Sequence, residues 1–218
     1  MSDNLTTYLT KTQRLLSDPN NQYWSVSELT DDINQARVRV CGDTKCLRTL
    51  ITGVDLTTAQ EQYQISTTVN SGTPANLGPY VLEVISVTIY WGNLRVKCQN
   101  RSFTEQDAKL RIFQNYQTRP GSLAMMGGVY VYLNPVPDQA YVSDWDCVVA
   151  PVPLTSGAPT ETIPVVFQPL VPFFAAHLAK YGEQSMQESD IYYRKYLLER
   201  QAAMYAFFSA RWRDAYRR

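Results

Sequence analysis

The chain has little of what acid–base catalysis needs. Its 218 residues include one histidine, His177, so a serine or cysteine nucleophile would have a single imidazole to activate it. His177 lies in an apolar helical pattern among phenylalanine, leucine and tyrosine, which favours a structural role. No glycine-rich phosphate loop followed by lysine is present either, because Gly127-Gly128 stands between two strand patterns. We therefore predict no catalytic residues, no cofactor and no enzymatic activity.

The cysteines are too few and too scattered for a zinc site. No two of them form a Cys-x-x-Cys pair, and one histidine adds little to the ligand set. We expect reduced, mostly buried thiols and no metal site. The four residues are Cys41, Cys46, Cys98 and Cys147.

The sequence also lacks a net charge and a long hydrophobic run. Lysine plus arginine and aspartate plus glutamate both total 20, so there is no bulk attraction to nucleic acid or membrane. The charge is uneven, however: seven basic and two acidic residues follow Asp190, and the rest of the chain is correspondingly acidic. No run of about 18 apolar residues predicts a membrane span, and the first four residues have no signal-peptide character. We expect synthesis in a cytoplasm and no membrane partner.

Helical patterns occupy both ends of the chain and strand patterns its middle. This order predicts an α+β fold, in which an antiparallel α-helical bundle of N- and C-terminal helices carries a central inserted antiparallel β domain. The predicted parts are N-terminal bundle helices over 1–49, the inserted β domain with a short helix over 50–150, a Pro-rich extended return segment over 151–168, and C-terminal bundle helices with an extended terminal helix over 169–218.

The second helix has clear start and packing signals. Ser25 and Glu28 form a capping-box pattern, and Trp24 before the cap can pack on Leu29. Arg37 lies off the apolar stripe that follows, together with Arg39 and Asp31, and we expect these charged side chains in solvent. The predicted bundle core consists of Leu29, Ile33, Ala36, Val40, Phe174 and Leu178.

The middle of the chain predicts two hairpins. Tyr80 to Trp91 turns through Gly92-Asn93 into a short return strand, and Leu123 to Met126 turns through Gly127-Gly128. We expect Tyr141 to Val149 to pair beside the second hairpin, and a short helix from Thr104 to about Phe113.

One pair of carboxylates makes a hydrolase an alternative function. Asp144 and Asp146 alternate on a strand pattern, so both would point to one face and could hold a metal or act as an acid–base pair. Because no third ligand lies nearby in sequence, we favour solvated strand carboxylates.

The last 31 residues read as one helix that is aromatic nearly all the way round. Two apolar rows interleave on it, Leu198, Ala202, Tyr205, Trp212 and Tyr216 on one, and Tyr193, Leu197, Met204 and Phe208 on the other. We expect one row to close the bundle and the other, with its arginine tip, to bind a protein partner, although the pattern does not assign individual aromatics. Contact with nucleic acid, or a helix that only completes its own bundle, are the alternatives. The predicted partner-binding residues are Tyr205, Phe208, Arg211, Trp212, Arg213, Tyr216, Arg217 and Arg218.

Residues 5–48 resemble the opening of the head-to-tail connector, or adaptor, proteins of short-tailed, podovirus-like phages. The shared features are a helix ending in Leu15-Leu16 before Asp18-Pro19-Asn20, an aromatic residue before a capped second helix, and the stretch Asn34 to Arg37. Weaker similarities follow in the same order at Phe103–Arg111, Arg119–Met125, Tyr132–Tyr141 and Val171–Ser185.

This resemblance implies a structural virion protein in the neck or tail. It implies a homo-oligomeric ring, a dodecamer, that docks under the portal protein, receives the tail nozzle and extends a channel through which DNA passes without sequence-specific binding. Tail fibres or spikes are further candidate partners. The functional alternative is a nucleic-acid-binding accessory protein that uses the arginine-rich C-terminal helix.

Overall fold

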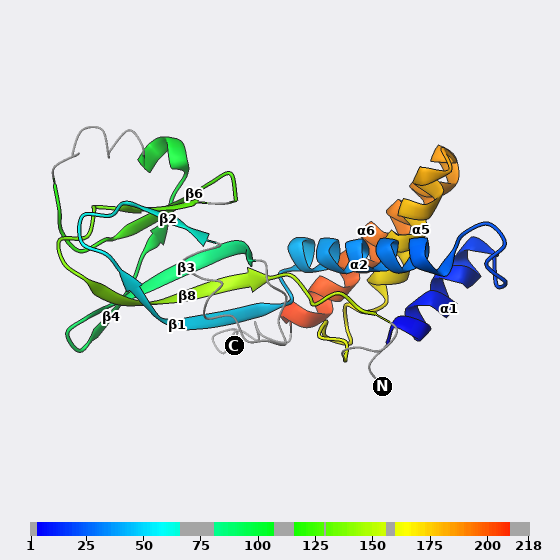
Figure 1. Cartoon of the computed structure of the whole chain (residues 1–218), viewed down its shortest axis with the longest axis horizontal. Helices are drawn as coiled ribbons and strands as arrows, with labels where there is room; N and C mark the ends of the chain where they lie inside the picture. The colour runs from blue at the N-terminus through cyan, green and yellow to red at the C-terminus, as the bar shows by residue number, and fades with distance from the viewer. Residues whose placement is uncertain (1–3, 66–80, 107–115, 129, 156–159, 210–218) are drawn as a thin grey trace, which may run out of the picture. The chain divides into compact units, whose positions relative to one another are not determined.

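The computed structural model describes residues 4–65, 81–106, 116–128, 130–155 and 160–209 (Figure 1). They form a mixed α+β structure, which confirms the predicted fold class at this level. The chain divides into two compact units: a helical unit of Met1–Leu47 with Pro151–Arg218, and a strand unit of Arg48–Ala150. Each unit is described by itself.

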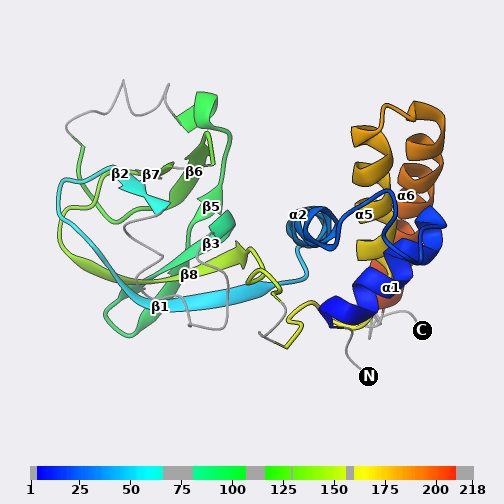
Figure 2. The ribbon, with the colours of Figure 1, turned by 45° about the vertical axis from the view of Figure 1, so that its right-hand side comes forward.

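In the part of the helical unit that the structure describes, two long helices come from each end of the chain. Helix α5 packs against the other three, and α5 and α6 lie side by side (Figure 2). The core between α1, α2 and α5 gathers Leu16, Trp24, Leu29, Ala176 and Ala179. The bounds are α1 Leu5–Leu16, α2 Val26–Thr44, α5 Leu170–Gly182 and α6 Met186–Ser209.

Helix α2 begins where the capping pattern predicts. The backbone N–H of Glu28 donates to the Ser25 hydroxyl at 3.2 Å, and the N–H of Ser25 donates to the Glu28 carboxylate at 2.9 Å. These two bonds satisfy backbone donors that the first turn leaves unpaired. The helix ends at Thr44, after which Lys45 adopts a left-handed conformation with φ 52°.

Arg37 corrects the sequence-based expectation, because it is buried and only 1% exposed. Its guanidinium forms a two-pronged ion pair with Glu161 of the return segment, with nitrogen–oxygen distances of 2.8 and 2.9 Å. It also donates to the carbonyl of Val152 at 2.7 Å. Asn34, one turn earlier, exchanges two hydrogen bonds with the backbone of Leu154. The buried charge is tolerated because it is paired and because each of its three nitrogens donates a hydrogen bond.

The described residues of the strand unit form two four-stranded sheets, which Figure 1 shows stacked as two layers. The first has the order β1-β8-β3-β4 and the second β2-β7-β6-β5, antiparallel except where β5 meets β6. Hydrophobic residues from both layers are buried between them. The bounds are β1 Arg48–Leu56, β2 Gln62–Gln64, β3 Val81–Trp91, β4 Leu94–Lys97, β5 Gln99–Asn100, β6 Ser122–Met126, β7 Tyr130–Asn134 and β8 Tyr141–Val149.

Both predicted hairpins are confirmed, as β3 with β4 and β6 with β7. The prediction that Tyr141 to Val149 pairs beside the second hairpin is wrong, because this strand, β8, lies in the other sheet between β1 and β3. Only the first turn of the predicted helix after Ser102 is described, over residues 103–106, and its remainder lies outside the described residues. Strand β8 is buried along most of its length, so its backbone needs a hydrogen-bonded strand on each edge. The hairpin β6–β7 has no free edge to offer, because β7 pairs with β2 and β6 with β5.

Candidate partner-binding site

The inner face of α6 holds the helix to its own unit through aromatic side chains. Tyr196 is fully buried, and its ring meets that of Phe174 on α5 edge to face, with centroids 5.0 Å apart. Near the described end of α6, Phe207 makes a similar contact with Phe167, at 5.2 Å. Because these contacts lie about eleven residues apart, they hold α6 over about three turns.

A polar cluster around Asp43 ties the same face to the end of α2. One carboxylate oxygen of Asp43 accepts hydrogen bonds from the Tyr196 hydroxyl at 2.8 Å, from Arg200 at 3.0 Å and from Arg39 at 3.2 Å. Burial, together with the neighbouring Asp43 carboxylate, raises the pKa of Tyr196 above its ordinary value. Tyr196 therefore stays a hydrogen-bond donor at physiological pH.

Replacing Tyr196 with phenylalanine should lower the free energy of unfolding by about 1.5 kcal/mol, the contribution of a hydrogen bond to a charged acceptor. Urea denaturation, followed by helical circular dichroism, measures this change. Tyr205→Phe is the matched control, because Tyr205 lies on the same helix but is 68% exposed, and it should shift stability by less than about 0.5 kcal/mol. Equal effects of the two substitutions would contradict the assignment of the inner face.

The outer face of α6 carries large apolar side chains at every seventh position. Ile191 is 58% exposed, and Leu198 and Tyr205 are both 68% exposed. Residues seven apart on a helix lie nearly above one another, so these three form one row, which we call the outer row. Such a row is the pattern that a helix presents to another helix packed along it.

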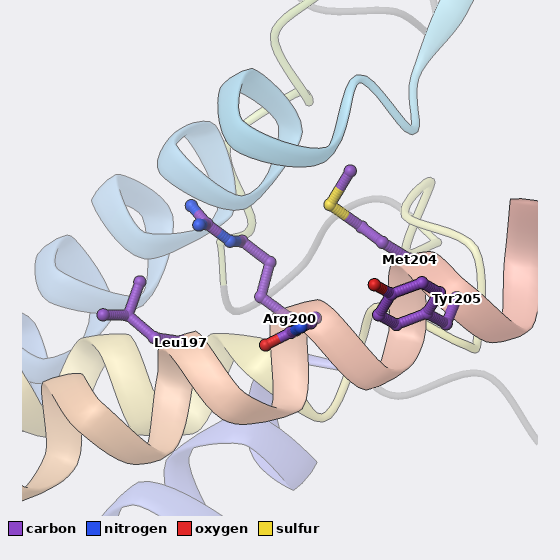
Figure 3. Close-up of a pocket in the computed structure, with 5 residues that line it drawn as sticks. Leu197, Arg200, Met204 and Tyr205 are labelled. Atoms are coloured by element: carbon purple, nitrogen blue, oxygen red, sulfur yellow. The ribbon is translucent and has the colours of Figure 1, made fainter.

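A hollow of about 460 Å³ lies along α6 near this row. Its lining comes from Leu197, Arg200, Gln201, Met204 and Tyr205, and Figure 3 shows four of these side chains projecting from successive turns of the helix. The exposed residues Arg194 and Lys195 stand between the first two members of the outer row. An apolar row beside a concave wall and basic side chains is typical of a protein-binding surface.

For the described part of α6, the structure shows which of the two predicted apolar rows is exposed and which is partly buried. Leu198, Ala202 and Tyr205 are exposed, whereas Tyr193, Leu197 and Met204 are half-buried. The strongest inner contacts, from Tyr196 and Phe207, belong to neither predicted row. Ile191 was missed as a member of the outer row because the prediction started from aromatic residues, although its spacing from Leu198 was a usable signal.

The predicted site residues fall in three groups. Tyr205 is on the exposed face, and for Phe208 only the helical backbone is described. Of the core residues, Leu29, Ile33, Ala36 and Val40 are fully buried, Phe174 is 8% exposed and Leu178 is half-buried. Outside the described residues lie Arg211, Trp212, Arg213, Tyr216, Arg217 and Arg218.

His177 on α5 and Ser189 on α6 lie close together. The Ser189 hydroxyl donates to the backbone carbonyl of His177, at 3.0 Å. Nδ1 of His177 lies 2.7 Å from that hydroxyl and 3.1 Å from the Ser189 carbonyl. These contacts tie α5 to α6.

One of the two carboxylates on β8 differs from the expectation that both are solvated. Asp144 is only 5% exposed and accepts hydrogen bonds from the Tyr90 hydroxyl and from the N–H of Gly53, so the prediction of a solvated side chain is wrong for it. Asp146 forms an ion pair with Arg48 on β1. Backbone and hydroxyl donors available inside the sheet make burial of Asp144 possible.

The described ranges contain no cluster of three or more histidine, cysteine, aspartate or glutamate side chains able to hold a metal. Within the same part of the chain, no helix combines the length and apolar character needed to cross a bilayer.

The fold and the outer row define an α+β protein with a surface typical of protein–protein contact. A model of the SU10 adaptor protein family matches residues 3–218, nearly the whole sequence, and the chain belongs to this family. It is thus a phage adaptor protein, a structural component of the virion that interacts with other head–tail proteins. No curated protein matches the sequence.

Proposed function

We propose that the protein forms the ring that joins the portal to the tail nozzle, that it extends the DNA channel, and that the outer face of α6 binds the portal protein. The observation that carries this proposal is the outer row of Ile191, Leu198 and Tyr205, exposed on a helix whose opposite face is already packed. Family membership supplies the class of partner, a head–tail protein of the same virion.

The chemistry of α6 indicates what the portal surface should offer. A row with seven-residue spacing fits between the side chains of a second helix, so we expect a helix or helical hairpin on the portal. Arg194 and Lys195 are exposed beside the row, and we expect acidic portal residues opposite them. Tyr205 combines a large ring with a hydroxyl, the combination often found at the centre of protein interfaces.

The finer architecture also belongs to this proposal. The helices of both chain ends would form an antiparallel bundle, with the strand unit inserted as the part that contacts neighbouring copies in a closed dodecamer. The protein would act by docking and not by catalysis, and it would retain the packaged genome. The arginines on which the nucleic-acid alternative depends lie outside the described residues, so no observation favours that alternative.

Replacing Leu198 or Tyr205 with glutamate should weaken binding to purified portal rings at least about tenfold, which corresponds to about 1.4 kcal/mol or more. The reason is that a charge is introduced into an apolar contact while the folded helix keeps its packed inner face. Affinity is measured by surface-immobilised portal rings titrated with each variant.

Tyr23→Glu is the matched control, since Tyr23 is 77% exposed, lies between α1 and α2, and receives the same substitution. Its affinity for portal rings should equal that of the unaltered protein. Circular dichroism of every variant verifies that the helices are intact. Unchanged binding by both α6 variants would refute the role of the outer row.

A further inference from the structure

Two cysteines lie side by side at the end of α2. Cys41, in the last turn, is fully buried, and Cys46, just beyond the helix, is half-buried. Their sulfur atoms are 3.8 Å apart and both thiols are free. A disulfide requires about 2.05 Å, so the sulfurs need to approach by about 1.8 Å, a distance that side-chain rotation can supply.

Local backbone geometry, not distant packing, brings the two sulfurs together. Lys45 has a left-handed φ of 52°, and its N–H donates to the carbonyl of Cys41 at 2.8 Å. This helix-ending turn reverses the chain and places the residue after it over the last helical turn. The pair is therefore a property of residues 41–46 themselves.

The two thiols differ in reactivity. The adjacent Cys41 thiol lowers the pKa of Cys46, and the Thr44 hydroxyl and two backbone N–H groups act in the same direction. The neighbouring Cys46, followed by burial, raises the pKa of Cys41. The other two cysteines of the chain, Cys98 and Cys147, are buried, and burial raises the pKa of each to about 12. Cys46 is also half-buried whereas Cys41 is fully buried, so an oxidant can reach only Cys46 directly, which makes Cys46 the attacking sulfur and Cys41 the resolving one.

We propose that Cys41 and Cys46 form an oxidative modification site, which closes to an intramolecular disulfide when the protein meets a small-molecule disulfide such as oxidised glutathione. The Cys46 thiolate attacks one sulfur of the oxidant, forms a mixed disulfide and releases one glutathione thiolate. Cys41 then loses its proton to that thiolate or to water, attacks the Cys46 sulfur and releases the second glutathione. In sum, two protein thiols are oxidised to a disulfide and one glutathione disulfide is reduced to two thiols.

A virion component passes from a reducing to an oxidising environment, so this thiol pair would change its oxidation state during the life of the particle. Thiols stay reduced in a cytoplasm and oxidise outside it, so the pair would be open while the protein folds and assembles and closed after release of the particle. The segment that closes, residues 41–46, ends one residue short of β1, where the chain leaves the helical unit for the strand unit. A bridge there would restrict the backbone torsions of that connection.

The test uses the full-length, reduced protein incubated with oxidised glutathione, alkylated and digested with trypsin. Trypsin cleaves after Arg39, Lys45 and Arg48, so the two cysteines fall on different peptides and the disulfide appears as peptides 40–45 and 46–48 linked together. We expect this linked pair as the main product, with Cys98 and Cys147 alkylated.

Cys41→Ala is the informative variant, because it removes the resolving thiol and keeps the attacking one. We expect glutathione to remain on Cys46 at an occupancy at least about tenfold above that in the unaltered protein, since the intramolecular second step is absent. Cys46→Ala should give neither product. If a variant fails to fold, the linked peptides from the unaltered protein still decide whether Cys41 and Cys46 form a disulfide. Absence of the linked peptides, or equal modification of Cys98 and Cys147, would overturn the proposal.

Discussion

Replacing Arg37 with methionine is expected to lower the free energy of unfolding of the helical unit by about 3–5 kcal/mol. The Glu161 side chain is fully buried and would lose the guanidinium that pairs with it. The carbonyl of Val152 would lose a donor at the same time. Urea denaturation followed by helical circular dichroism reports this unit directly, because the four described helices longer than one turn belong to it.

A double-mutant cycle separates the ion pair from the packing of the arginine stem. Glu161→Met alone should cost a similar amount, since it leaves Arg37 charged and buried. The double variant, Arg37→Met with Glu161→Met, should lose no more than either single variant, because an apolar pair carries no unpaired charge. Strictly additive losses in the double variant would show that the two side chains do not depend on each other. Arg39→Met, at a half-exposed position two residues away on the same helix, is the control and should cost less than about 1 kcal/mol.

Arg37 also shows where prediction from sequence ends. The start of α2 could be predicted, because the capping box of Ser25 and Glu28 lies within four residues and its physics is local. The burial of Arg37 could not, because its partner Glu161 lies 124 residues further along the chain. Periodicity alone assigns a charged residue to solvent, and only a distant carboxylate reverses that assignment.

The same distinction between local and distant interactions explains the strand unit. A hairpin needs only its turn, so both hairpins were predictable, whereas the position of β8 depends on β1, which pairs with it from about 90 residues earlier in the chain. Sequence order alone placed β8 beside the nearest hairpin, and the choice between two sheets depends on packing that spans the whole unit.

For α6, the amino-acid composition prevented a prediction of which face is buried. Because aromatic and aliphatic residues surround the helix, its periodicity does not single out one face. The structure distinguishes the faces by contacts that the helix makes elsewhere: Tyr196 with Asp43, and Phe207 with Phe167. Tyr205, a predicted partner-binding residue, is exposed, and its role in binding stays a prediction, whereas Ile191 was found only once burial was known.

Trp145→Ala is expected to cost about 3–5 kcal/mol in the strand unit, the range for removing a large buried aromatic residue. Trp145 is fully buried on the central strand β8, paired with Ile51 of β1 and Val87 of β3. Its ring meets Tyr63 of β2 edge to face at 6.3 Å, so one side chain packs between the two sheets. Its indole N–H donates to the Ser143 hydroxyl at 2.8 Å.

Hydrogen exchange measured by mass spectrometry distinguishes this effect from a general loss of structure. Amides of β1, β3 and β8 should lose protection in Trp145→Ala, because the cavity weakens the sheet that these strands share. Trp91→Ala is the matched control: Trp91 lies on β3 of the same sheet but is 48% exposed, and the Arg119 guanidinium lies 4.6 Å from its ring centre. That contact contributes about 0.5–1 kcal/mol, so the same substitution should leave most of the protection intact. If both variants lost protection equally, Trp145 would not be the residue that holds the two sheets together.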